Sequence, residues 1–305
     1  MQPQTNTKIV AALEQWRLEL KFIHTCLNVH DKATIMVKDL NSMGFQVSTL
    51  ELETENLNST FFVPLPKSRL SPSPCALPDH TLFPTPKDKK TKKAFELGKH
   101  FTGTVLLIHF LMTLLGLKTS VPITQVEALC QLRRSNSDEL YKDVKWESTK
   151  GTFKYKVSEA FTICKGKPHL LITMASDCKA TDKTLAVSEL ITLITFMRKN
   201  MAIEIHKKKH LKKRPRKHVY TNMICPILLI SIVNTLQVRI IQAHYENGFK
   251  IQVSKLYDFN TIFHKEPMDL FIRWMIPRAR GNTKWTPPLP VLDELSEEME
   301  IEDST

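Results

Sequence analysis

The sequence predicts an α/β or α+β protein in which helices come first and a mixed β-sheet core with flanking helices follows. Three observations support this prediction. Apolar residues recur at helical spacing near the N-terminus, short apolar or alternating runs typical of strands begin after residue 150, and a helix-spaced segment separates the second of these runs from the third. A hydrophobic content of 42% with 24% charged residues is enough to build an ordinary globular core.

Residues 1–60 are predicted to form a small helical module. Ile9, Leu13 and Trp16 follow the i, i+3, i+4 spacing of a helix with one buried face. Asp31 is a candidate N-cap for a second helix, and a third short helix is expected after it.

Residues 61–93 are predicted to be a Pro-rich and basic linker. Seven of the 17 prolines fall within residues 64–86, a density that disfavours both helices and central strands. The basic run KDKKTKK follows at residues 87–93. We therefore expect this stretch to be extended and solvated.

Residues 94–280 are predicted to form an α/β domain whose first part is helical and whose strand-rich core spans residues 151–280. The apolar run 105–117 is shorter than the roughly 20 residues that a membrane-spanning helix needs, so it is interpreted as a buried core helix. Residues 135–150 are polar and are expected to form a loop.

The core of this domain is predicted to run strand, strand, helix, strand, strand, strand, helix. Asn247-Gly248 favours the positive φ angles of a type I′ turn and so predicts a hairpin, and Pro267 marks the start of a closing helix. The expected strands are residues 152–161, 170–175, 227–233, 237–245 and 250–255, and the expected helices are residues 182–199 and 267–276.

The strand–strand–helix–strand order resembles the core of PD-(D/E)XK (restriction-endonuclease-like) nucleases, in which an acidic residue precedes a strand that ends in (D/E)-x-K. Glu159 stands eighteen residues before Asp177, which opens the triplet Asp177-Cys178-Lys179. The resemblance implies two carboxylates that hold Mg²⁺, with Lys179 orienting water or stabilising charge. About three acidic-x-Lys triplets are expected by chance, and three D-x-K are present, so a degenerate, non-cleaving core is favoured over a working nuclease.

The C-terminal half also resembles a recurring pattern in an uncharacterised ascomycete (fungal) protein family with a C-terminal α/β domain. The segment CPILLISIVNTLQVRIIQAHYENGFKIQVSKLYDF, followed by EPMDLFIRW, has the same order of apolar strand, Arg-bearing strand, hairpin, third strand and closing helix. The match covers residues 155–276. It implies a fungal, intracellular protein, and since such genes can lie in secondary-metabolite clusters, an accessory role in a biosynthetic pathway is one alternative function.

The strongest functional signal is the basic block, residues 206–218, which reads HKKKHLKKRPRKH. Eight of its thirteen residues are Lys or Arg, and like charges at this density favour a polyanion or solvent over a packed core. Such a block is typical of a nuclear localisation signal or a nucleic-acid patch, and we expect it in a loop after the helix 182–199. The predicted patch residues are Lys207, Lys208, Lys209, Lys212, Lys213, Arg214, Arg216 and Lys217.

The remaining charge is unevenly distributed. The net charge is +12, and residues 293–303 carry seven acidic groups and no basic one, so without them the chain would carry +19. Residues 281–305 are therefore predicted to be a disordered acidic tail. The rest of the chain is basic enough to be attracted to phosphate polyanions, with an affinity that falls steeply with salt.

Cofactors and compartment are less strongly indicated. Six widely spaced cysteines without a C-x-x-C pair fit free thiols in a reducing compartment, and the N-terminus has no secretory signal pattern. His206 and His210 have the i, i+4 spacing of a metal pair, but their basic neighbours would oppose a dication. No metal or other cofactor is expected, except Mg²⁺ if the nuclease alternative holds.

Taken as a whole, the sequence predicts a non-enzymatic nuclear protein, with cytoplasmic presence as an option, that associates with nucleic acid or chromatin, in a regulatory role. Nucleic acid or a nuclear import receptor is the expected partner, and no membrane is expected. The alternatives are the accessory biosynthetic protein and a metal-dependent nuclease-like hydrolase.

Overall fold

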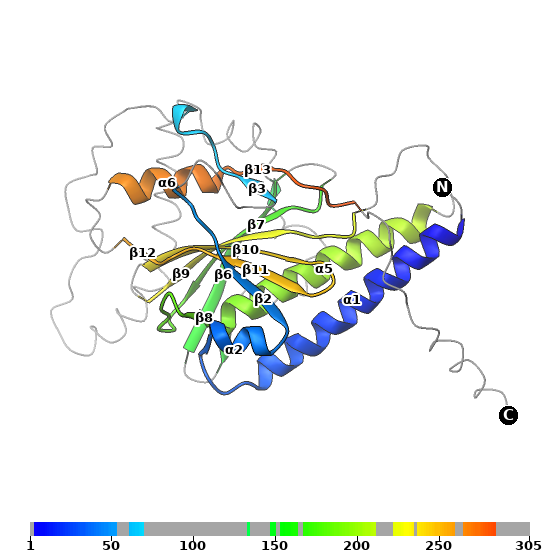
Figure 1. Ribbon diagram of the computed structural model, residues 1–305, viewed down its shortest axis with the longest axis horizontal. Coiled ribbons are helices and arrows are strands. Elements are labelled where there is room, and N and C mark those ends of the chain that lie inside the picture. Colours follow the sequence, from blue (N-terminus) through cyan, green and yellow to red (C-terminus); the bar gives the residue numbers. More distant parts are fainter. Residues whose placement is uncertain are drawn as a thin grey trace.

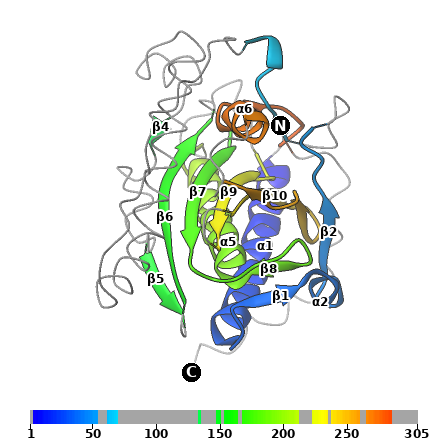
Figure 2. The same cartoon turned by 90° about the vertical axis from the view of Figure 1, so that its left-hand side faces the viewer.

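A mixed β-sheet, covered on one face by two long helices and on the other by a shorter one, organises the molecule (Figures 1 and 2). The predicted α/β or α+β class is confirmed. The computed structural model describes residues 3–53, 61–69, 133–134, 147–150, 153–163, 167–211, 222–234, 237–259 and 265–284.

Nine strands of the described residues make the central sheet. They are β2 (Phe45–Thr49), β4 (Arg133–Arg134), β5 (Glu147–Lys150), β6 (Phe153–Thr162), β7 (Leu170–Ser176), β9 (Ile227–Val233), β10 (Gln237–Tyr245), β11 (Phe249–Val253) and β12 (Tyr257–Asp258). The main path is β2-β11-β10-β9-β7-β6-β4, with β12 on β10 and β5 on β6. The pairs β7–β9 and β2–β11 are parallel, and the other pairs are antiparallel.

Helices α1 (Pro3–Val29) and α5 (Val187–Leu211) lie side by side on one face of this sheet, and α6 (Lys265–Met275) lies on the other (Figure 1). The remaining elements are short. They are α2 (Val37–Ser42), the 3-10 turn η1 (Lys67–Arg69), and two small antiparallel pairs: β1 (Thr34–Met36) with β8 (Thr184–Ala186), and β3 (Phe62–Val63) with β13 (Arg278–Ala279).

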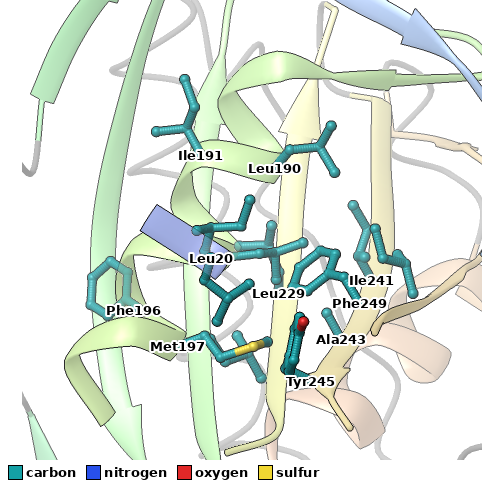
Figure 3. Packing of buried hydrophobic residues seen from close by; sticks show 14 of the residues in the cluster. Leu20, Leu190, Ile191, Phe196, Met197, Leu229, Ile241, Ala243, Tyr245 and Phe249 are labelled. Carbon is teal, nitrogen blue, oxygen red and sulfur yellow. The ribbon is translucent and has the colours of Figure 1, made fainter. Parts of the chain in front are cut away.

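The parallel pair β7–β9 explains the layered arrangement. Two parallel neighbours need a crossover connection, and α5 provides it. All seven residues of each strand are buried, as expected for strands covered on both faces. Figure 3 shows Leu190 and Met197 of α5, with Leu20 of α1, packed against Leu229 and Ile241 of the sheet.

The boundary predicted at residue 60 does not separate two cores. Helix α1 forms as predicted, but Ile9, Leu13 and Trp16 are buried in the same cluster as α5 and the sheet. The predicted second helix is reduced to α2, with β1 in front of it, and β2 stands where the third helix was expected to begin. Because β2 pairs with β11, about 200 residues away in the sequence, helical periodicity alone could not reveal it.

Three other predicted segments differ from the structure. Residues 61–69, assigned to the solvated linker, are part of the fold, because β3 pairs with β13 and both Phe61 and Phe62 are buried. Arg133–Arg134 and Glu147–Lys150, expected in a helix and a loop, are strands that pair with β6. The apolar run 105–117 and the rest of the linker lie outside the described residues.

Within the described ranges, no helix is both long and apolar enough to cross a membrane. Three described cysteines, Cys26, Cys178 and Cys225, are free thiols, and the last two are buried.

The C-terminal core follows the prediction more closely. The strand and helix order is as predicted, and β9 and β10 have the predicted bounds. The hairpin between β10 and β11 has a three-residue connection, residues 246–248, in which Asn247 (φ 49°) and Gly248 (φ 129°) both have positive φ angles. The turn was predicted at Glu246-Asn247-Gly248, and the positive φ angles that Asn-Gly favours are present.

Helix α5 both starts and ends later than predicted. It continues to Leu211, so the first six residues of the basic block, expected in a loop, are helical. Met197, Met201 and Ile205 extend its buried stripe at i, i+4 spacing, which holds the helix onto the sheet up to the block. Basic residues in a last turn also interact favourably with the negative end of the helix dipole.

Candidate nucleic-acid interface

The three residues of the nuclease-like motif are not brought together. In the β6–β7 register Glu159 lies opposite Thr173, whereas the backbone N–H of Asp177 bonds to the carbonyl of Lys154. Asp177 is therefore four residues farther along the strand, or about 13 Å at the usual rise per residue. Two carboxylates that bind one Mg²⁺ must approach much more closely.

Asp177 has a structural role instead. One oxygen of its half-buried carboxylate accepts the backbone N–H of Lys154 at 2.6 Å and so extends the ladder between β6 and β7. Lys179 is exposed, and burial raises the pKa of Cys178 between them to about 11, which keeps that thiol protonated. In the described residues no group of three or more His, Cys, Asp or Glu side chains could hold a metal ion.

A second set of charged residues, an ion pair in the core, also has a structural role. Arg239 of β10 and Glu189 of α5 are fully buried and form a bidentate ion pair, in which the Arg239 Nε donates to Glu189 at 2.8 Å. The second guanidinium arm donates to the carbonyls of Thr181 and Thr184. Glu189 also accepts the N–H of Ala186 at 2.7 Å, which caps the start of α5. All three nitrogens of the Arg239 guanidinium group thus bond to atoms of the protein.

The C-terminal end of α5 begins the predicted basic patch. The Lys209 ammonium group lies 3.1 Å from the Glu14 carboxylate of α1, and His206 is exposed beside it. Lys207 and Lys208 belong to the same helical turns, but their side chains are outside the described part of the structure. The other predicted patch residues, Lys212, Lys213, Arg214, Arg216 and Lys217, also lie outside it.

Two further segments bring cations to this end of the molecule. The loop before β7 is held against α5, because the Asn200 amide donates to the Pro168 carbonyl at 2.9 Å. The strand β13 and the residues after it lie on that loop, where His169 donates to the carbonyl of Arg280 at 2.9 Å. The exposed cations Lys167, Arg278 and Arg280 are placed here as a result.

The chain that follows the basic block is attached to α5 from Asn222 onward. Asn222, the first described residue after the block, forms a β-bridge with Lys284, and the Thr283 hydroxyl donates to its side-chain oxygen at 2.6 Å. The backbone N–H of Asn222 donates to the buried Glu204 of α5 at 3.3 Å. Residues 281–284, which were assigned to the acidic tail, are thus partly packed, and the tail itself lies outside the described residues.

The surface formed by these contacts is called the basic end. It consists of the last turns of α5 with Lys209, and of Lys167, Arg278, Arg280 and Lys284, whose segments are tied to the second half of α5 through Asn200 and Glu204. Two acidic side chains near this surface already have partners. Glu14 forms an ion pair with Lys209, and the buried Glu204 accepts the backbone N–H of Asn222.

Sequence reasoning missed the cations that the fold adds to this surface. Lys167 has only one basic neighbour in the sequence, Lys165. Two lysines do not mark a basic surface in the sequence. The segment RARGNTK at residues 278–284 carries three cations in seven residues and could have been noticed. Only the contacts with α5 place both segments next to the basic block.

Comparison of the chain with protein-family models, with curated proteins and with solved structures finds no match. The resemblances to an ascomycete family and to a nuclease-like core remain predictions from the sequence.

Proposed function

We propose that the protein is a nuclear protein that associates with nucleic acid through the basic end, in a regulatory or chromatin-associated role. The observation that carries the proposal is that exposed cations from three separate segments lie on or are tied to α5, the helix that runs into the basic block. These segments are the last turns of α5, the loop at Lys167, and residues 278–284.

The chemistry of the basic end suits a phosphate backbone better than a small anion. Its cations are exposed and spread over several elements, so they match a series of phosphates rather than one buried group. Contacts of this kind release condensed counterions, and affinity therefore falls linearly with salt on a logarithmic scale. No base-reading element is assigned, so the expected binding depends weakly on nucleotide sequence.

Binding of duplex DNA, measured at several salt concentrations, tests this proposal. Replacing Lys167, Arg278 and Arg280 by Ala should weaken binding at least tenfold and reduce the salt slope by about two to three, since each lost phosphate contact contributes about 0.9. A matched control is the triple alanine variant of Lys32, Lys38 and Lys183, which are exposed lysines around the distant β1–β8 pair. A salt-independent affinity, or equal losses in both variants, would contradict the proposal.

The nuclear part of the proposal has a separate test. Substitution of all five residues Lys212, Lys213, Arg214, Arg216 and Lys217 by Ala should abolish nuclear accumulation of a tagged protein. If the unmodified protein is cytoplasmic, the nuclear location is wrong. DNA binding by the purified protein would not be affected by that result.

A further inference from the structure

A separate pocket of about 500 Å³ lies between α6, the β11–β12 connection, η1 and the residues after β2. This volume is within the roughly 300–1,000 Å³ typical of small-molecule sites. In Figure 1, β12 and the start of α6 lie at the opposite end of the sheet from the C-terminal end of α5, and no residue that lines the pocket belongs to the basic end. It is lined by Glu53, Lys67, Lys255, Tyr257, Asp269, Leu270 and Arg273.

One wall of the pocket is electrically neutral. The Glu53 carboxylate lies 3.0 Å from the Lys255 ammonium group and accepts the Tyr257 hydroxyl at 3.1 Å. The bonds from Lys255 and Tyr257 hold the pKa of Glu53 below its ordinary value, so Glu53 stays ionised. Lys255 also lies 5.0 Å above the centre of the Tyr257 ring. Together, Glu53 and Lys255 satisfy each other's charge.

The other two cations of the lining, Arg273 and Lys67, have no carboxylate at ion-pair distance in the described part of the chain, and so differ from Lys255. Arg273 is half-buried, and its Nε donates to the Leu65 carbonyl at 2.6 Å, which fixes the plane of the guanidinium group. Among the described residues, this is the one hydrogen bond of the Arg273 side chain, and the Lys67 side chain has no hydrogen bond or ion pair. The remaining carboxylate of the lining, Asp269, has an interaction of its own.

The position of the Arg273 guanidinium group favours binding of an anion. Burial lowers the pKa of Arg273, because desolvation disfavours the charged form. An oxyanion that accepts two parallel bonds from the free arms would compensate for this desolvation. The carbonyl of Leu65 holds the group in one orientation, so little side-chain freedom remains to be lost on binding.

We propose that the pocket binds the oxyanion of a small ligand, a phosphate or a carboxylate, between the guanidinium group of Arg273 and the ammonium group of Lys67. Leu270 and the ring of Tyr257 supply the apolar part of the lining. The neutral pair Glu53–Lys255 closes the other side without adding net charge.

Calorimetric titration of the full chain with inorganic phosphate, and in a second series with acetate, tests the proposal and distinguishes the two anions. Lys67→Ala should weaken binding of the preferred anion about tenfold, which is the effect of losing one charge-assisted bond. Arg273→Lys should weaken it at least as much, because a lysine keeps the charge but loses the two-pronged geometry. Lys21→Ala, an exposed lysine on α1 across the sheet, is the matched control and should bind normally.

A variant with the opposite expected effect strengthens the test. Glu53→Gln removes the carboxylate that neutralises Lys255, so it should tighten binding several-fold. Absence of binding by the unmodified chain at millimolar phosphate and acetate would overturn the proposal. Unchanged affinity in Lys67→Ala would also overturn it, even if Arg273→Lys failed to fold. Neither result bears on DNA binding at the basic end.

Discussion

Arg239 and Arg273 lie on opposite faces of the same sheet and are surrounded very differently. Arg239 points towards α5, is fully buried, and donates to Glu189 and to two backbone carbonyls. Arg273, on α6, is half-buried, and among the described residues its side chain bonds to one backbone carbonyl. The first arginine therefore joins β10 to the start of α5, whereas the second has donors left over and lines a pocket.

The contrast between these two environments shows which arginines near a core are candidates for ligand binding. Burial alone does not indicate function, because a buried guanidinium group with every arm paired is part of the scaffold. A partly buried guanidinium group whose terminal nitrogens have no carboxylate partner is the better candidate for binding an anion. Variants of the two arginines and of a buried histidine test this distinction.

Arg239→Met should destabilise the protein by about 3–5 kcal/mol, because it leaves the Glu189 carboxylate buried without a positively charged partner. Urea unfolding of the variant and the unmodified chain measures the difference. In the double variant Arg239→Met with Glu189→Met much of the stability should return, apart from the cap at Ala186. If the single and double variants were equally unstable, the ion pair would not be the reason.

The stability of the protein should fall in acid because of two buried histidines on the α6 side of the sheet. Burial lowers the pKa of His169 and of His244 to about 4, from an ordinary 6.5 in the unfolded chain. Between these values the unfolded chain binds the protons, so stability is complete above pH 6.5 and is lost as the pH falls towards 4. Each histidine should contribute a loss of about 2 kcal/mol between pH 7 and pH 5.

Unfolding free energies across this pH range check the prediction. His244→Gln should remove about half of the pH-dependent loss. This His packs 4.7 Å from the Phe61 ring, so the variant is also expected to be less stable at pH 7. A pH profile that is unchanged in the variant would show that His244 does not titrate in this way.

Arg273→Met should cost only about 1 kcal/mol in water, because a half-exposed group loses one hydrogen bond and leaves no buried charge behind. The same variant should lose the increase in melting temperature that the preferred anion gives to the unmodified chain. Thermal unfolding with and without phosphate measures both effects. A loss as large as that of Arg239→Met would erase the distinction between the two arginines.

The parts of the fold that local sequence determines were predicted well. Strands β9 and β10 have the predicted bounds because their apolar runs end at turn residues, and the Asn247-Gly248 hairpin depends on neighbours in the chain. Strand β2 was missed because its partner, β11, is remote in sequence. The same reason applies to β3, whose pairing with β13 brings the supposed linker into the fold.

The same holds for the candidate sites: features that are contiguous in the sequence were predicted, and those that depend on contacts between remote segments were not. The basic block was visible because its charges are contiguous in the sequence. The cations at Lys167 and Arg278 become part of the same surface only through contacts with other elements, and the pocket at Arg273 combines four separate segments. Conversely, Asp177 and Glu159 suggested a metal site by their spacing in the sequence, which the strand register does not support.

The bridge between Asn222 and Lys284 has a consequence for regulation by charge. It ties two oppositely charged stretches to one anchor: Lys217 is five residues from Asn222, and Asp293 is nine residues from Lys284. At no more than about 3.5 Å per residue, tethers this short keep the acidic stretch within some tens of ångströms of the basic one. We therefore expect a phosphate polymer bound at the basic end, as proposed, to compete with this tethered polyanion, whose local concentration does not fall when the protein is diluted.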